Sequence, residues 1–183
     1  FLNAAEKSAN FVIDKLIDDN GQLMKRYRNN NVGISGMIED YAFFIWGLIE
    51  LYQATFSNKY INIASELADY QINHFWDFDN GGFYFISDLS EELIVRNKEV
   101  YDGAIPSGNS VSANNYIKLS RILSRPDYED IAYKITHSFA PNLNKYGRGS
   151  SMMLQAIDFM EGPSYEVIIA GDRKKSKKII NEI

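Results

Sequence analysis

The stretch LIELYQATFSNKYINIA, residues 48–64, matches YIKLSRILSRPDYEDIA, residues 116–132, at an offset of 116 − 48 = 68 residues. In each segment a run with helical apolar spacing is followed by a short polar break (SNK or SRPD) and a second helical run. Such breaks are natural turns. Aligned residues of the two segments are Ile49 with Ile117, Leu51 with Leu119, Tyr60 with Tyr128, Ile63 with Ile131, and Ala64 with Ala132. Repetition at this period indicates stacked helical hairpins.

A second internal match extends the repeat toward the start of the chain. Residues 3–21 align with residues 62–80, at an offset of 62 − 3 = 59 residues. Both segments run into an Asp/Asn/Gly turn, which is followed by a short alternating stretch at 22–28 or 81–87. We expect the stretch at 81–87 to pair with 92–98 as a β-hairpin. The common unit is therefore an outer helix, a turn or hairpin, an inner helix and the next outer helix.

The apolar spacing predicts helices over 1–18, 38–56, 59–77, 109–124, 127–140 and 150–160. The helix over 38–56 is apolar nearly all round, which is typical of a helix buried on more than one face. The helix over 59–77 has a single apolar stripe and reads as an outer helix. Helical hairpins of this kind predict an all-α fold, either an α/α toroid or a solenoid. Six helices make about half of a closed six-hairpin ring, and we expect self-association because a half ring leaves surfaces uncovered.

The two ends of the chain differ from this pattern. Residue 1 lies inside a run that is already helical in period, so we expect the chain to begin inside a larger protein. We expect a partial toroid over 1–162 and an extension over 163–183. The apolar run 164–172 follows a Gly-Pro break and predicts a buried strand, whereas 173–183 predicts a basic helix with a solvated face.

Composition excludes several classes of function. The net charge of −5 comes without a basic face, so we expect no nucleic-acid partner. No apolar run approaches the roughly 20 residues needed to cross a bilayer, so we expect no membrane partner. Cysteine is absent, which excludes thiolate metal sites, favours a reducing compartment and leads us to expect a cytoplasmic protein. His74 and His137 lie far apart in predicted outer helices, so we expect no metal site and no cofactor.

The first polar stretch is VGISGMIEDYAFFIWG, residues 32–47. Glu39 and Asp40 fall in the first turn of a predicted inner helix, where carboxylates cap free amides and suit the helix dipole. In an α/α ring, however, the starts of inner helices surround a central pocket. There, paired carboxylates could bind sugar hydroxyls or act as general acid and base. Trp46 lies further along this helix and could stack on a sugar ring.

The second polar stretch is EVYDGAIPSGNS, residues 99–110, and it precedes the next inner helix. Ser107 or Asn109 can cap that helix. Capping alone does not need the whole polar set, which favours a cavity wall. The set is Tyr101, Asp102, Ser107, Asn109 and Ser110. A third inner-helix start, at 146–156, contains Arg148, which could point inward or lie on a surface loop.

Four ordered motifs carry a family resemblance: EDYAFFIWGLIELYQATF, FWDFDNGGFYF, RNKEVYDGAIPSGNS and YEVIIAGD. Over residues 30 to 172 the chain resembles the C-terminal region of the YyaL-like, spermatogenesis-associated family of thioredoxin-domain proteins. The resemblance implies a six-hairpin toroid similar to N-acylglucosamine 2-epimerases and mannose isomerases, with a thioredoxin-like domain upstream. It implies motif positions around the toroid cavity at Glu39, Asp40, Arg96, Lys98, Glu99, Tyr101, Asp102, Ser107, Gly108 and Asn109.

One departure from that pattern matters for function. Sugar epimerases of this fold use histidines as acid and base, and neither histidine of this chain lies at a predicted inner-helix start. Acid–base work would therefore fall to Glu39, Asp40, Glu99 or Asp102. Contacts with a sugar-like ligand would fall to Tyr101, Ser107, Asn109, Arg96, Arg148 and Trp46.

Three hypotheses remain open at this point. The chain could be part of a sugar isomerase, epimerase or glycosidase. It could be a non-catalytic module that binds a ligand or a protein and serves a thioredoxin-like domain. The polar stretches could also be elaborate helix caps and nothing more. Aromatic side chains and carboxylates at the inner-helix starts favour the first hypothesis, whereas the missing acid–base histidine favours the second. We rank the three in the order given, with the first slightly ahead of the second.

Overall fold

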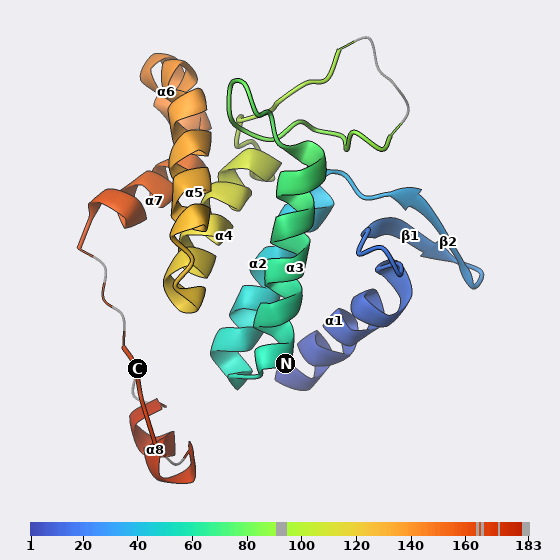
Figure 1. Ribbon diagram of the computed structural model, residues 1–183, viewed down its shortest axis with the longest axis vertical. Helices are drawn as coiled ribbons and strands as arrows, with labels where there is room; N and C mark the ends of the chain where they lie inside the picture. Colours follow the sequence, from blue (N-terminus) through green and yellow to red (C-terminus); the bar gives the residue numbers. More distant parts are fainter. Residues whose placement is uncertain (91–94, 164, 166, 172, 181–183) are drawn as a thin grey trace.

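The computed structural model describes all residues except 91–94, 164, 166, 172 and 181–183 (Figure 1). Its main helices are α1 (Leu2–Leu16), α2 (Ile38–Thr55), α3 (Asn58–Phe75), α4 (Gly108–Leu123), α5 (Pro126–Ser138) and α7 (Ser151–Glu161). Shorter elements are α6 (Ala140–Tyr146), the 3-10 turn η1 (Gly147–Gly149) and α8 (Arg173–Ile180). Strands β1 (Met24–Arg28) and β2 (Asn31–Ser35) form an antiparallel pair.

The helices form an inner and an outer layer, as the apolar patterns predict. The inner helix α4 lies between α2 and α7 and packs on both, while the outer helices α3 and α5 pack on α2 and α4. Most side chains of α4 are buried, including Val111, Tyr116 and Ile117 at 0% exposure. The helix α4 is buried because its neighbours cover it on several sides. The predicted bounds of these helices are confirmed to within about two residues at most ends.

Aromatic side chains hold the two layers together. Tyr116 on α4 donates from its hydroxyl to the Ala68 carbonyl of α3 at 2.7 Å and packs edge-on against Tyr128 of α5. Tyr128 in turn donates to the Asp69 carboxylate at 2.7 Å. Burial raises the pKa of Tyr116 well above its ordinary value, so its hydroxyl remains a donor. These bonds keep inner and outer helices in register.

The first alternating stretch forms a hairpin and the second does not. Asn29 and Asn30 at the β1–β2 turn have φ angles of 52° and 57°, the left-handed geometry of a two-residue hairpin turn. At 81–87 the predicted strand is wrong, because that stretch makes only an isolated bridge between Phe83 and Trp76. Its partner stretch 92–98 lies partly outside the described residues. The described part makes one backbone–backbone bond to 81–87, from the Phe85 N–H to the Asn97 carbonyl, and otherwise contacts it through the side chains of Arg96 and Lys98.

The C-terminal segment also departs from expectation. The predicted buried strand 164–172 lies partly outside the described residues, and its described residues form no strand. Tyr165 and Ile168 are 88% and 87% exposed, so the prediction of burial is wrong for them. The predicted helix after it forms as α8. The boundary at residue 162 stays a prediction. No helix in the described part of the chain is long and apolar enough to span a bilayer.

Candidate functional site

The N-termini of the inner helices converge, and the connecting loops run across them (Figure 1). Gly108, the first residue of α4, lies directly against the start of α2. A β-carbon at Gly108 would come within 2.8 Å of Ile38 Cγ2 and 3.2 Å of the Glu39 nitrogen. A glycine is therefore required for this close approach. The polar stretches singled out in the sequence meet at this end of the molecule.

Asp102 connects two of these helix starts through its carboxylate. Its Oδ1 accepts the Ser107 N–H at 2.9 Å, and its Oδ2 accepts the Met152 and Met153 N–H groups at 2.8 and 3.3 Å. Two of these donors are free amides in the first turn of α7, so Asp102 caps that helix from a distant loop. Both carboxylate oxygens are thus engaged by the backbone, which is a structural role.

Ser107 and Asn109 are buried at the start of α4 and hold the loops in place. Ser107 caps the helix by accepting the Ser110 N–H at 3.2 Å. The Asn109 side chain accepts the Phe83 N–H at 2.7 Å and donates to the Phe83 carbonyl at 3.0 Å. It also donates to the Glu99 carbonyl at 2.9 Å. The amide of Asn109 therefore replaces a missing strand partner for the loop.

Arg96 and Lys98 are also engaged within the loop. The Arg96 guanidinium lies 4.1 Å from the Tyr84 ring centre and donates to the Ile86 carbonyl at 2.8 Å. Lys98 Nζ contacts the buried Asp77 carboxylate at 2.8 Å. Burial alone would raise the pKa of Asp77, but the Lys98 bond together with backbone donors outweighs it and lowers that pKa. Arg96 and Lys98 therefore anchor the loop. The family resemblance placed both residues at the cavity but could not distinguish this structural role from ligand binding.

Glu39 and Glu99 form the carboxylate pair left available at this end. Burial, followed by the negative charges of Glu99 and Asp40, raises the pKa of Glu39 above its ordinary value. No hydrogen bond among the described residues holds the Glu39 or Glu99 carboxylate. Asp40 differs, because it accepts the Met37 N–H at 2.8 Å and so caps α2. A carboxyl group with a raised pKa beside a second carboxylate is suited to acid–base work.

A pocket of about 260 Å³ opens on the exposed inner face of α2, α4 and α7. Trp46 lines it, and the Trp46 indole donates to Glu50 at 3.1 Å while Lys118 Nζ contacts the same Glu50 oxygen at 3.0 Å. The pocket-lining residues are Trp46, Asn114, Asn115, Ile117, Lys118, Met152, Gln155, Asp158 and Phe159. Glu39 and Trp46 are seven residues apart and share one face of α2, about 10 Å along its axis.

Most of these lining residues were missed in the sequence. The available signal was spacing: Asn114 and Lys118 are four residues apart on α4, and Gln155 and Phe159 are four apart on α7. Residues on a solvent-facing stripe of a helix have the same spacing. The pocket forms only because α2, α4 and α7 lie next to one another, which the spacing does not show.

Tyr101 and Arg148 stay outside this pocket. Tyr101 is 66% exposed, and its ring covers Gly149, where a β-carbon would lie 3.0 Å from Tyr101 Cδ2. Arg148 lies in η1 and is exposed. In the described part of the chain, no group of three or more His, Cys, Asp or Glu residues is arranged to hold a metal ion.

No family model matches the chain, but several curated proteins are similar to it in sequence. It is 31% identical to human spermatogenesis-associated protein 20 over 184 residues, covering 94% of this chain and 23% of the human protein. The rat protein of the same name is 34% identical over 139 residues, covering 75% of this chain and 18% of that protein. An uncharacterized protein from Caenorhabditis elegans is 32% identical over 183 residues, covering 95% and 25%. The chain thus spans a quarter or less of these curated relatives.

Among solved structures, the fold resembles that of a GH76 α-mannanase from Bacteroides thetaiotaomicron, with a TM-score of 0.64. The match covers 87% of this chain and 46% of the mannanase chain, at 12% sequence identity. At that identity the likeness concerns the fold alone. It confirms the predicted glycosidase-like α/α toroid, of which this chain corresponds to about half.

Proposed function

Because this chain belongs to the family of spermatogenesis-associated protein 20, and its fold is a glycosidase-like toroid, we propose that it forms part of a carbohydrate-active domain. The cavity of that domain is bounded by the inner helices α2, α4 and α7. Sugar isomerisation, epimerisation and glycoside hydrolysis are the candidate reactions. The chain spans a quarter or less of its curated relatives, so the activity of the whole protein is part of this proposal.

The observation that carries the proposal is the pocket on the inner face. It combines two aromatic side chains, Trp46 and Phe159, with polar side chains of α4 and α7. Aromatic faces bind the apolar face of a sugar ring, while amide, carboxylate and ammonium groups bind its hydroxyls. Lys118, Gln155 and Asp158 supply these polar groups.

Glu39 is the proposed general acid of this domain, and Glu99 is its partner carboxylate. A raised pKa keeps a carboxyl group protonated closer to neutral pH, which an acid catalyst needs. Asp40 and Asp102 are less suited to proton transfer, because backbone N–H groups already occupy their oxygens. Acid–base work by either residue would require those caps to open.

The test is a thermal-shift screen of the chain against monosaccharides, disaccharides and N-acyl hexosamines. We expect one of these classes to raise the melting temperature, and the Trp46→Ala variant to lose that effect. Phe78→Ala is the matched control, since Phe78 is an aromatic residue that is 77% exposed and lies outside the pocket. A cooperatively melting protein that responds to none of these sugars would refute the carbohydrate proposal.

A second candidate function is a non-catalytic binding module attached to a thioredoxin-like domain. The capping roles of Asp40 and Asp102 favour this binding module, because they leave only Glu39 and Glu99, of the four proposed catalytic carboxylates, available for proton transfer. Incubation of the stabilising sugar with the chain, followed by product analysis, separates the two candidates. Turnover that Glu39→Gln abolishes supports the enzyme, whereas binding without turnover in the wild-type chain supports the module.

A further inference from the structure

Two asparagines of α4, Asn114 and Asn115, present hydrogen-bond acceptors to the pocket on the inner face of α2, α4 and α7. The NH2 group of Asn114 donates to the Ser110 and Met152 carbonyls at 3.0 and 2.8 Å. The NH2 group of Asn115 donates to the Ala42 carbonyl at 2.7 Å. Because a carbonyl oxygen can only accept, these bonds fix which end of each amide is the NH2 group. The amide oxygens are the ends left for a ligand.

Asn115 is a fixed part of this wall. Its side chain is buried, with the residue 1% exposed. No described residue donates to its amide oxygen, yet that oxygen is not fully enclosed by protein atoms, so it opens onto the pocket that Asn115 lines. Rotating the amide to offer its NH2 group would place its oxygen against the Ala42 carbonyl and leave two acceptors facing each other. The pocket therefore keeps an acceptor at this position.

The positive charge at this pocket is already paired, whereas a negative charge is not. Lys118 Nζ contacts the Glu50 carboxylate at 3.0 Å, so these two charges compensate each other. In the described part of the chain, no hydrogen bond or ion pair engages the carboxylate of Asp158, which is exposed and lines the pocket. The net charge of the chain, −5, has the same sign. The pocket therefore favours a cationic group over an anionic one.

We propose that this pocket selects a sugar that carries a protonated amine, with Asp158 as the counter-charge of that amine. The inference rests on the proposed carbohydrate function and names the substrate class of the same site. An ammonium group donates three hydrogen bonds and accepts none, so it matches the acceptors of Asn115 and Asp158. The rings of Trp46 and Phe159 also favour a cation beside them. A sugar carboxylate or phosphate would instead meet a charge of its own sign at Asp158.

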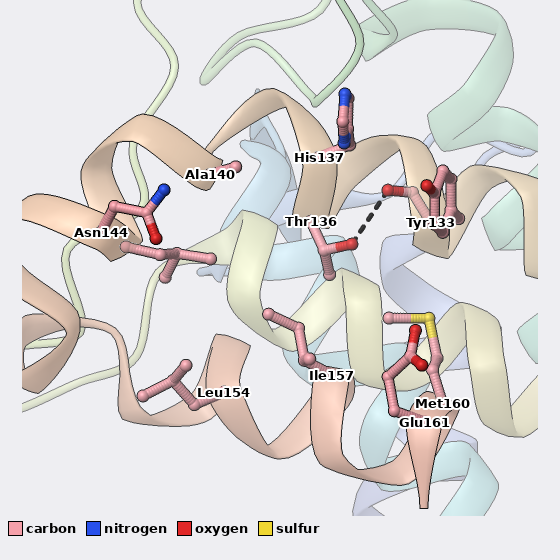
Figure 2. A pocket seen from close by; sticks show the side chains of 10 residues that line it. Tyr133, Thr136, His137, Ala140, Asn144, Leu154, Ile157, Met160 and Glu161 are labelled. Carbon is pink, nitrogen blue, oxygen red and sulfur yellow. Dashed lines mark hydrogen bonds between the residues drawn. The ribbon is translucent and has the colours of Figure 1, made fainter.

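The helix α7 also lines a second hollow, of about 300 Å³, together with α5 and α6 (Figure 2). Leu154, Ile157 and Met160 supply apolar side chains to this second hollow, and Glu161 is the carboxylate among the residues that line it. Asp158 and Glu161 are three residues apart in α7 but line different hollows. A change at Glu161 is therefore a matched control for the same change at Asp158.

Isothermal titration calorimetry with matched sugars measures this selection. One series is glucose, glucosamine and glucuronate, and the corresponding manno and galacto compounds form two more. In the series that binds, we expect the hexosamine to bind about tenfold tighter than the hexose, because its amine adds a charge-assisted hydrogen bond at a partly exposed site. The hexuronate should bind most weakly. Added salt should reduce the difference between hexosamine and hexose, because it screens the charge of Asp158.

Variants of the two α7 carboxylates test the assignment to Asp158. Asp158→Asn should bring the ratio of hexosamine to hexose affinity close to one, and Asp158→Lys should reverse the preference in favour of the hexuronate. Glu161→Gln should keep the wild-type ratio, because Glu161 lines the other hollow. Asp158 and Glu161 are both exposed, so each variant should melt cooperatively, as a thermal scan would verify.

The outcomes separate this inference from the carbohydrate proposal. A hexosamine that binds no tighter than its hexose, or a preference that survives in Asp158→Asn, overturns the inference and leaves sugar binding in place. A preference lost in Glu161→Gln instead places the amine in the second hollow and also overturns it. If none of these sugars binds, the inference fails, and the thermal-shift screen with disaccharides and N-acyl hexosamines decides the carbohydrate proposal independently.

Discussion

Replacing Asp102 with asparagine separates its capping role from a catalytic one. The change keeps the side-chain shape but leaves one oxygen where the carboxylate has two. If that oxygen stays on the Met152 and Met153 N–H groups, the new NH2 group faces the Ser107 N–H, so two donors meet. A lost hydrogen bond to a charged group costs about 1.5–3 kcal/mol. Removing a charge from the start of α7 adds about 0.3–1 kcal/mol.

Asp102 is partly exposed, and water compensates some of this loss. We therefore expect Asp102→Asn to lower the free energy of unfolding by about 2–3 kcal/mol, which leaves a domain of ordinary stability folded. Urea titration followed by circular dichroism measures the midpoint and slope. The matched control is Asp14→Asn, because Asp14 is an exposed aspartate of α1 and its loss should change stability little.

The result that refutes this reasoning is an Asp102→Asn variant as stable as the Asp14→Asn control. In that case the three backbone bonds contribute nothing net, and Asp102 returns to the group of candidate catalytic residues. A destabilised variant that still binds the stabilising sugar supports the assignment of Asp102 as a brace between helix starts.

Three further outcomes are expected. Asn109→Ala leaves the buried N–H and carbonyl of Phe83 without their partner and removes a part-buried bond to the Glu99 carbonyl. It should lower the free energy of unfolding in urea titration by about 3 kcal/mol, whereas Asn73→Ala, at an exposed position, should be nearly neutral. Folding raises the pKa of Glu39, so the ionisation of its carboxyl group lowers the free energy of unfolding as the pH rises above the ordinary value of 4.5. Glu39→Gln should therefore stabilise the protein at pH 7 but not at pH 4. Equal changes in the free energy of unfolding at the two pH values would contradict this. Gly108→Ala places a β-carbon against Ile38, so the melting temperature of this variant should fall by several degrees. An unchanged melting temperature would show that α2 and α4 can move apart at little cost.

The candidate site shows where reading the sequence stops being sufficient. The polar stretch 99–110 was recognisable as unusual, but its residues fall into two groups that the sequence could not separate. The side chains of Asp102 and Asn109 accept hydrogen bonds from the backbone N–H groups of Met152 and Phe83, which are distant in the chain. Glu99 keeps its carboxylate available near Glu39. Which polar residue is structural depends on donors from other segments.

Patterns within single segments of the chain were enough to predict the helices, their inner or outer position and the family. Apolar periodicity is a local property, and a helix buried on several faces shows it in its own residues, as α2 does. Only contacts between segments explain why no strand forms at 81–87, why Tyr165 and Ile168 are exposed, which carboxylates bind backbone N–H groups, and how Trp46, Lys118 and Asp158 come to line one pocket. Those features depend on hydrogen bonds and packing between segments tens of residues apart, and no pattern within one segment records its partner in another.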